Sequence, residues 1–353
     1  MGNLKRFFFI VYRLISFKKT PVGLRSTFED LGPTFIKLGQ LLASRPDFIP
    51  KEYAEELRKL LDQERSVSFT LIEKTIREEL GSNVDDIFRE IDPVPVSSAS
   101  IGQVHEAILD SGEKVIVKVR KPGIELVIGQ DIKILRFLMN FLRRFNSFRD
   151  LGVEKILKEF FWWIEKELDL RMEMERGQTL TNNLKDLAFI KIPKMYKQYS
   201  TEKILVAEYV EGITVNEVLN EIKKQNITDL KDLKLPFPID FPKVISEMIE
   251  CYIFKQILTD GFFHGDPHPA NLILLPKNRI ALVDFGIMAV LDKSEHAEVL
   301  MVILSIIEDD PKILLHVLTS IAEKELTRKD ELEITDSLSE ELHRLLNCRR
   351  PKK

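Results

Sequence analysis

Residues 264–271 read His264-Gly265-Asp266-Pro267-His268-Pro269-Ala270-Asn271, and residues 283–286 read Val283-Asp284-Phe285-Gly286. Asn271 follows Asp266 by five positions, and Asp284 follows it by 18. The apolar runs 272–275 and 280–283 predict two short strands, so these polar residues stand at strand edges. Carboxylate and amide oxygens are the ligands that Mg²⁺ prefers. The pattern therefore predicts a site for a divalent cation and phosphate groups.

The same two stretches match the order H-x-D-x-x-x-x-N and then D-F-G of kinase-like enzymes. In that pattern Asp266 faces the attacking hydroxyl, while Asn271 and Asp284 hold Mg²⁺. An alternative is a transition-metal cluster of His264, Asp266 and His268. Two prolines stiffen this loop and no further histidine lies nearby, so kinase-like phosphate chemistry is the favoured hypothesis.

The composition is that of an ordinary globular protein. With 353 residues, 44% hydrophobic and 31% charged, the chain is long enough for one two-lobed domain or two domains. The only cysteines, Cys251 and Cys348, exclude a disulfide framework and favour a reducing compartment. No apolar run reaches 18 residues, so we expect a cytoplasmic chain without a transmembrane helix.

Positive charge gathers at both ends of the chain. Residues 1–28 contain six basic and no acidic residues, and residues 342–353 contain five basic and no acidic residues. Within 1–19, apolar side chains at helical spacing form one face: Leu4, Phe7, Phe8, Val11, Leu14 and Ile15. This pattern predicts a helix at an anionic membrane surface and peripheral association, with no nucleic acid partner. The alternative is that the helix packs on the protein itself.

Four regions follow from the pattern. Residues 1–28 form the basic amphipathic segment and residues 29–90 a helical extension. Residues 91–212 form an N-lobe with a β-hairpin at 101–108 and 114–119, and residues 213–353 form a helical C-lobe with the catalytic loop. The predicted fold class is α+β, a bilobal kinase-like fold with an N-terminal helical extension and a hinge near 208–214.

Lys118 stands at the end of the second hairpin strand, where kinase-like folds place the lysine that contacts nucleotide phosphates. A lysine in a strand more often faces solvent, which is the alternative. Its partner would be a glutamate on a long helix predicted over about 153–176. That stretch contains five acidic residues, among which the pattern alone does not choose: Glu165, Glu167, Asp169, Glu173 and Glu175.

At this point the chain resembles the UbiB/ADCK family of atypical kinase-like ATPases. The matching segments cover about residues 30–290 in the family order. They are Lys37-Leu38-Gly39-Gln40, Ser97-Ser98-Ala99-Ser100 followed by Ile101-Gly102-Gln103-Val104-His105, Lys118, Glu167-Leu168-Asp169, and the two stretches quoted first.

The resemblance implies a role for each matched residue. Asp266, Lys118 and Glu173 would be catalytic, with Glu173 pairing Lys118 as the residue four positions after Asp169 on one helix face. The nucleotide-binding set would be Ser97, Ser98, Ala99, Ser100, Lys118 and Glu208, and the metal set Asn271 and Asp284. The family typically has alanines in this loop, so the serine hydroxyls here add phosphate donors and leave the nucleotide preference open.

The resemblance also implies that Lys37 and Gln40 reach toward Glu167 and Asp169 and occlude the cleft. In the sequence, Lys37, Gln40 and Ser44 form a polar seam on an otherwise apolar helix, and Gly39 permits close backbone approach. Without the resemblance, a seam of this kind usually faces water.

The implied function is an atypical kinase-like ATPase that binds ATP and Mg²⁺ and supports ubiquinone or related isoprenoid-quinone biosynthesis. Its expected partners are an isoprenoid lipid or phenolic intermediate and quinone-biosynthesis enzymes. One alternative is a conventional phosphotransferase acting on a protein or small-molecule hydroxyl. Another is a nucleotide-gated scaffold without enzymatic activity.

Overall fold

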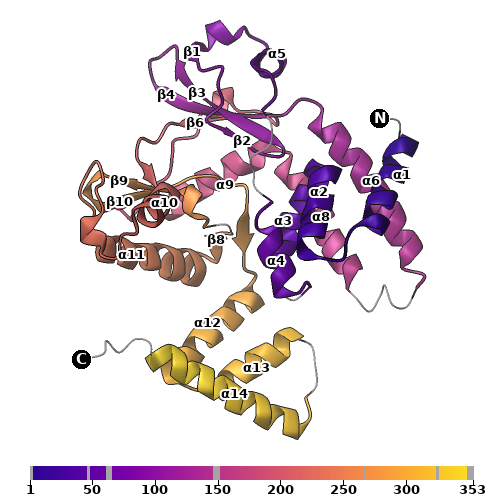
Figure 1. The fold of residues 1–353 in the computed structure, drawn as a ribbon. Coiled ribbons are helices and arrows are strands. Elements are labelled where there is room, and N and C mark those ends of the chain that lie inside the picture. The colour runs from indigo at the N-terminus through magenta and orange to yellow at the C-terminus, as the bar shows by residue number, and fades with distance from the viewer. Residues whose placement is uncertain are drawn as a thin grey trace. The chain divides into compact units, whose positions relative to one another are not determined.

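The computed structural model describes residues 3–45, 48–60, 66–145, 152–265, 267–322 and 326–347. Asp266 and Cys348 therefore lie outside the described residues. The chain divides into two compact units (Figure 1). The first contains Met1–Thr179, Ile192–Glu211 and Val283–Gly286, and the second contains Leu180–Lys191, Gly212–Leu282 and Ile287–Lys353.

The first unit combines helices with a five-stranded sheet. Its helices are α1 (Asn3–Ser16), α2 (Pro21–Leu31), α3 (Pro33–Ala43), α4 (Lys51–Leu57), α5 (Phe69–Leu80), α6 (Ile124–Leu142), α8 (Val153–Glu167) and the greater part of α9 (Leu170–Asn183). Its strands are β1 (Phe88–Ile91), β2 (Ser97–Ser98), β3 (Gly102–Leu109), β4 (Lys114–Arg120) and β6 (Ile204–Glu208). The predicted hairpin is present as β3 and β4.

The sheet has the strand order β1-β3-β4-β6, and β2 pairs with β3. On β4, Val115, Val117 and Val119 are fully buried in one cluster that includes Ile72 and Ile76 of α5. Side chains alternate between the two faces of a strand. Lys118 therefore lies on the face of the sheet opposite to α5.

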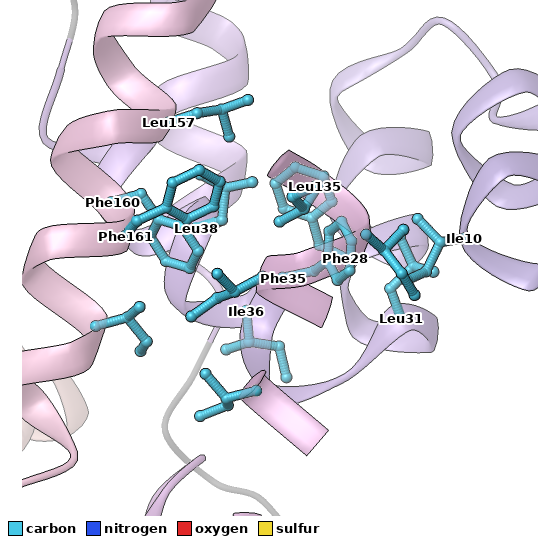
Figure 2. Packing of buried hydrophobic residues seen from close by; sticks show 14 of the residues in the cluster. Ile10, Phe28, Leu31, Phe35, Ile36, Leu38, Leu135, Leu157, Phe160 and Phe161 are labelled. Atoms are coloured by element: carbon cyan, nitrogen blue, oxygen red, sulfur yellow. The ribbon is translucent and has the colours of Figure 1, made fainter. Parts of the chain in front are cut away.

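The helices of the first unit form a second apolar core, shown in Figure 2. Its buried side chains come from α1, α2, α3, α6 and α8: Ile10, Phe28, Leu31, Phe35, Ile36, Leu38, Leu135, Leu157, Phe160 and Phe161. A Cβ atom at Gly39 would lie 2.3 Å from Leu60 Cδ1 and 2.8 Å from Phe28 Cδ2. Glycine at this position is thus what allows α3 to pack this closely.

The second unit contains two small sheets and a series of helices. The sheets have the orders β5-β10-β9-β7 and β11-β8. The strands are β5 (Ile190–Lys191), β7 (Ile213–Thr214), β8 (Phe262–His264), β9 (Leu272–Leu275), β10 (Arg279–Leu282) and β11 (Met288–Val290). The helices are α10 (Val215–Gln225), α11 (Phe241–Ile249), the π-helix η4 (Glu250–Asp260), α12 (Lys293–Glu308), α13 (Pro311–Ala322) and α14 (Arg328–Asn347).

Short 3₁₀ turns complete the two units: η1 (Val84–Asp86), η2 (Lys197–Tyr199), η3 (Leu230–Asp232), η5 (Pro269–Asn271) and η6 (Pro276–Asn278). Within the described ranges, none of the helices has the length and apolar character needed to cross a bilayer.

The prediction of one long helix over 153–176 is wrong, because α8 ends at Glu167 and α9 begins at Leu170. Tertiary contacts cause the break. Arg120 of β4 donates a hydrogen bond to the carbonyl of Leu168. The backbone N–H of Leu170 donates to the carbonyl of Glu202 at 3.0 Å. Asp169 thus precedes α9, and the expectation that it shares a helix face with Glu173 is also wrong.

Candidate functional site

Lys118 and Glu173 form a close ion pair in the first unit. Lys118 Nζ lies 3.0 Å from Glu173 Oε1 and 2.8 Å from Oε2. The glutamate side chain is only 8% exposed and the lysine 19%. β4 presents Lys118 from the face of the sheet opposite to α5, and α9 presents Glu173. The structure therefore contains the pair that the resemblance implied.

Asp284 lies beside the same lysine, with its Oδ1 atom 3.5 Å from Lys118 Nζ. Its backbone has φ 60°, in the left-handed region that aspartate tolerates better than most residues. Its Oδ1 accepts a hydrogen bond from the backbone N–H of Gly286 at 3.2 Å. This local turn fixes a carboxylate that remains half-exposed.

The charges around Lys118 shift the pKa of both partners in the ion pair. Burial alone would lower the pKa of Lys118, but the nearby carboxylates of Asp284 and Glu173 outweigh burial and raise it. Burial raises the pKa of Glu173, as does the charge of Asp284, while Lys118 opposes both. The charge of Glu167 also acts on both groups. Three carboxylates thus surround one ammonium group, and this surplus of negative charge favours a bound cation.

Two residues of α9 that the sequence reasoning missed hold the Asp284-Phe285-Gly286 loop. Arg176 Nη1 donates to the carbonyl of Gly286 at 2.6 Å. A Cβ atom at Gly177 would lie 2.9 Å from the ring of Phe285, a side chain that is 1% exposed. The helix that carries Glu173 therefore also sets the position of the loop. An arginine and a glycine in a helix carry no local signal of this role.

Lys37 forms an ion pair with Glu167, and the nitrogen of Lys37 lies 5.6 Å from the ring centre of Trp163. Gln40 Nε2 donates to the carbonyl of Leu60 at 3.4 Å. Asp169 accepts from Arg171, with 2.7 Å between Oδ2 and Nη2. The seam on α3 thus reaches Glu167, whose charge acts on Lys118, while the carboxylate of Asp169 is hydrogen-bonded to Arg171 two positions later. The occluding role itself stays a prediction.

The serine-rich loop precedes β3. Ser97 and Ser98 pair with Val104 and Gln103, and the N–H of Ala99 donates to the carbonyl of Gly102 at 2.8 Å. The hydroxyl oxygens of Ser98 and Ser100 are buried without a hydrogen-bond partner. Buried hydroxyls normally find a partner, so this loop has unused donors.

Glu208, the remaining residue of the predicted nucleotide set, ends β6. Its carboxylate accepts from the backbone N–H of Lys194 at 3.2 Å. The chain passes from the first unit into the second between Glu211 and Gly212.

In the second unit, side chains of η4 hold the start of the catalytic loop. The backbone N–H of His264 donates to Gln256 Oε1 at 3.0 Å, and the Tyr252 hydroxyl donates to the carbonyl of His264. On the other edge of β8, the N–H of Gly265 donates to the carbonyl of Ile287 at 2.8 Å. The backbone groups of His264 and Gly265, the two residues before Asp266, are therefore held by hydrogen bonds on both sides of the strand. Sequence reasoning missed Gln256 and Tyr252, because a helical pattern does not indicate their target.

Asn271 is the last residue of the 3₁₀ turn η5 and stands directly before β9. Its N–H donates to the carbonyl of His268 at 2.8 Å. His268 Nδ1 in turn accepts from the N–H of Ala270 at 3.2 Å, so this nitrogen caps the turn. The local fold therefore orients Asn271 immediately ahead of a strand, as the motif requires.

Asp284 suits Mg²⁺ as a ligand, whereas the alternative cluster of His264, Asp266 and His268 includes a residue outside the described ranges. Across the parts of the chain that the structure describes, no group of three or more His, Cys, Asp or Glu side chains could hold a metal ion. Mg²⁺ is commonly bound through one or two protein carboxylates together with waters and substrate phosphates. Asp284, half-exposed among surplus carboxylates, fits that kind of ligand.

A five-stranded sheet with a buried lysine–glutamate pair, followed by a catalytic loop and Asp-Phe-Gly, defines a kinase-like α+β protein. A solved structure supports this fold: a Mycobacterium tuberculosis protein in complex with erythromycin matches with a TM-score of 0.57 and 24% identity, over 83% of this chain and 71% of that chain.

The chain belongs to the UbiB/ADCK family, since the model of the ABC1 atypical kinase-like domain matches residues 59–318. A Clostridium pasteurianum relative, named as an uncharacterized protein in the hydrogenase 1 5′ region, is 36% identical over 90% of this chain and 57% of its own length. The chloroplastic protein ACTIVITY OF BC1 COMPLEX KINASE 7 of Arabidopsis thaliana is 32% identical over 84% of this chain and 40% of its own length. The chain thus spans about half or less of these relatives.

Proposed function

We propose that this protein binds Mg·ATP and transfers or hydrolyses the γ-phosphoryl group. The observation that carries the proposal is the arrangement of Glu173, Lys118 and Asp284, with nitrogen–oxygen distances of 2.8 to 3.5 Å. A lysine held by a buried glutamate and an adjacent half-exposed carboxylate is the arrangement that kinase-like enzymes use to orient nucleotide phosphates. The family membership supports the same activity.

In the proposed mechanism each residue has a limited task. Lys118, oriented by Glu173, donates to phosphate oxygens, and the hydroxyls of Ser98 and Ser100 provide further donors. Asp284 and Asn271 would hold Mg²⁺, which neutralises the negative charge that develops on the phosphates when it is bound. Asp266 accepts the proton of the attacking hydroxyl or water. Positioning and charge neutralisation then account for most of the rate.

We further propose that the acceptor is water or a small amphiphile, and that the activity supports isoprenoid-quinone biosynthesis at a membrane surface. The basic, apolar segment 1–19 supports peripheral attachment to anionic lipid, and the family resemblance supports the quinone role. The Lys37–Glu167 pair supports restricted access, because it fixes a helix of the extension next to the charges that act on Lys118.

Two other functions differ in where the phosphate goes. A conventional kinase would label a peptide or another hydroxyl acceptor. A nucleotide-gated scaffold would bind ATP without releasing product, but such a protein has no need for the complete set of metal-binding and base residues.

The test follows the label of γ-labelled ATP during incubation with the purified chain, Mg²⁺ and a membrane lipid extract. We expect label in inorganic phosphate or in a lipid product, and little in generic peptides. Lys118→Met should abolish product formation. Lys114→Met is the matched control, since Lys114 lies on the same strand and pairs with Glu106 instead. Strong peptide labelling would favour the conventional kinase, and no product with retained nucleotide binding would favour the scaffold.

A further inference from the structure

Helix α1 has an inner and an outer apolar face. On the inner face Ile10 is fully buried in the helical core (Figure 2). Arg6 reaches the buried carboxylate of Asp131 on α6, with distances of 2.7 Å from Nε and 2.6 Å from Nη2, and it also donates to the carbonyl of Leu31. Asp131 accepts a further bond from Thr34 of α3 at 2.7 Å. A buried carboxylate with these partners fastens α1 to the first unit.

The outer face of α1 is apolar as well, and it is exposed. Leu4, Phe8, Tyr12 and Ile15 are 61% to 80% exposed and follow one another at intervals of four or three residues. Side chains at this spacing lie on the same side of a helix. A helix that already buries one apolar face on its own protein therefore presents a second one to its surroundings.

This outer face continues onto α6, which lies beside α1 in the first unit (Figure 1). Phe137 and Phe141 of α6 and Phe145 just beyond it are 49% to 59% exposed. The ring of Phe7 joins the two helices, with ring centres 5.6 Å from Phe8 and 5.7 Å from Phe137. The ring centres of Phe141 and Phe145 are 5.9 Å apart. Contiguous exposed apolar surface of this kind marks an interaction site.

All charged residues of the two stretches that carry these aromatic rings, residues 3–16 and 132–145, are basic. They are seven in number and no acidic residue occurs among them: Lys5, Arg6, Arg13, Lys133, Arg136, Arg143 and Arg144. Of these, Lys5, Lys133, Arg143 and Arg144 are exposed and are not used by the ion pairs that hold the helices together. Basic side chains that surround exposed aromatic and aliphatic ones are typical of surfaces that rest on anionic lipid.

We propose that the outer face of α1, together with Phe137, Phe141 and Phe145, is one preformed surface that docks on an anionic lipid bilayer. We call it the α1–α6 face. The inference rests on the membrane association proposed above and names its surface. It differs from a detachable N-terminal anchor, because the buried contacts of Ile10 and Arg6 keep α1 on the protein. The apolar rings enter the interface between headgroups and acyl chains, and the surrounding cations face the lipid phosphates.

The test is flotation of the full chain with phosphatidylcholine vesicles and with vesicles of equimolar phosphatidylcholine and phosphatidylglycerol. The wild type should float with the anionic vesicles and much less with the neutral ones, and high salt should reduce flotation. The double variant Phe137→Ser/Phe141→Ser, which leaves α1 intact, should lower the bound fraction about tenfold. Ile249→Ser/Phe254→Ser is the matched control, since these side chains are 48% and 57% exposed in the second unit.

A second variant, Lys5→Glu/Lys133→Glu, reverses two charges without removing an apolar side chain and should also lower flotation about tenfold. Equal flotation of the Phe137→Ser/Phe141→Ser variant and the wild type would overturn the proposal. Concentration-dependent dimerisation that the same variant abolishes, without any loss of flotation, would assign the face to a second copy instead. Mg·ATP binding is measured on the same samples, so a failure of the proposed activity and a failure of the membrane surface are separate results.

Discussion

Gly177 is a single position at which the spacing between α9 and the Asp284-Phe285-Gly286 loop is set. A methyl group there would lie 2.6 Å from the end of Met195 and 2.9 Å from the ring of Phe285. Both distances are too short for carbon atoms, so both contacts must lengthen, and the ring of Phe285 has to shift along with the end of Met195. Phe285 directly follows Asp284 in the chain. A displacement of Phe285 therefore changes the position of the Asp284 carboxylate beside Lys118.

We predict that Gly177→Ala weakens Mg²⁺-dependent nucleotide binding about tenfold and gives no gain in stability. Gly129→Ala is the matched control, because it lies within a helix and a methyl group there meets no atom within 4 Å. The control should stabilise the fold by roughly 0.5–1 kcal/mol, the helical preference of alanine over glycine. Chemical denaturation and nucleotide titration of both variants measure the two effects. Unchanged nucleotide affinity in Gly177→Ala would show that Phe285 does not transmit the change.

His105 is a second residue whose surroundings lead to a testable prediction, here on the pH dependence of stability. Its ring is fully buried, with Nδ1 2.7 Å from the carbonyl oxygen of Asp92 and Nε2 2.8 Å from the amide nitrogen of Gln103. The same Gln103 accepts from the backbone N–H of Val67 at 3.0 Å. Burial lowers the pKa of His105 below its ordinary value of 6.5, partly offset by the bond to Asp92. The neutral ring is therefore the form that the fold requires.

It follows that His105 contributes its full stabilisation above about pH 6.5 and that this contribution is lost as the pH falls, because the unfolded chain takes up the proton first. We predict that His105→Asn is less stable than the wild type at pH 8 but loses less stability between pH 8 and pH 5. Urea unfolding at both pH values measures the free energy of unfolding. The exposed His316→Asn serves as the control. An equal loss in all three proteins would exclude His105 as a source of the pH dependence.

At the scale of elements, the π-helix η4 positions the catalytic loop. In a π-helix the repeating hydrogen bond spans five residues. Two side chains follow the same interval: Gln256 Nε2 donates to Cys251 Sγ at 3.3 Å, and the Thr259 hydroxyl donates to the carbonyl of Phe254 at 2.7 Å. Burial raises the pKa of the Cys251 thiol to about 11, so this cysteine is a packing residue. Gln256 is thereby held between Cys251 and His264.

We predict that Gln256→Met lowers turnover about tenfold, the rate equivalent of about 1.4 kcal/mol, while nucleotide affinity changes little. The reason is that Gln256 fixes the backbone just before Asp266, whereas Lys118 and Asp284 lie in other elements. Tyr252→Phe, which removes one hydroxyl, should have a smaller effect in the same direction. Steady-state kinetics separates kcat from KM. A rise in KM with unchanged kcat would contradict this role for η4.

The sequence predicts the elements around the site better than their ends. The alternation of Val115, Val117 and Val119 identifies β4, and the apolar runs identify β9 and β10, because each pattern records a buried strand face. The break between α8 and α9 escapes prediction, since Arg120, 48 residues earlier in the chain, causes it through the carbonyl of Leu168. The π-helix escapes for a similar reason, as its residues also suit an α-helix.

Among the candidate site residues, the motif spacing predicts Asp284 and Asn271 directly, whereas Glu173 is predicted only by resemblance. Five acids occur between 165 and 175, and the helix break decides which of them faces Lys118. Arg176 and Gly177 are invisible in the sequence because their partners, Gly286 and Phe285, lie more than 100 positions away. Long-range contacts are therefore the part of the site that local pattern does not contain.

At the scale of the whole molecule, the four residues Val283–Gly286 belong to the first unit, while the chain on both sides of them belongs to the second. The position of Asp284 is thus set by Lys118, Arg176 and Gly177. The helical extension belongs to the same unit, and its Lys37 forms an ion pair with Glu167 of α8. The Lys37–Glu167 ion pair therefore belongs to the same unit as Lys118.

We predict that Lys37→Ala changes the ratio of ATP hydrolysis to self-phosphorylation severalfold, in favour of self-phosphorylation. The substitution removes the partner of Glu167, whose charge acts on Lys118, and it loosens the extension that we propose restricts access. Lys51→Ala, on the exposed side of α4, is the matched control. Thin-layer separation of labelled products, with and without a simple alkylphenol, gives the ratio. Identical ratios in all three proteins would exclude the occlusion hypothesis.

The central claim is that Asp284 binds Mg²⁺ together with the nucleotide phosphates, and Asp284→Asn tests it. Asparagine also tolerates the left-handed backbone at φ 60°, so the variant removes the charge and keeps the turn. Calorimetric titration with ATP, in Mg²⁺ and in EDTA, compares the wild type, Asp284→Asn and the exposed control Asp336→Asn. We predict Mg²⁺-dependent binding in the wild type and the control, and at least about hundredfold weaker binding in Asp284→Asn with unchanged circular dichroism. Equal, Mg²⁺-dependent affinity in all three proteins would contradict the account.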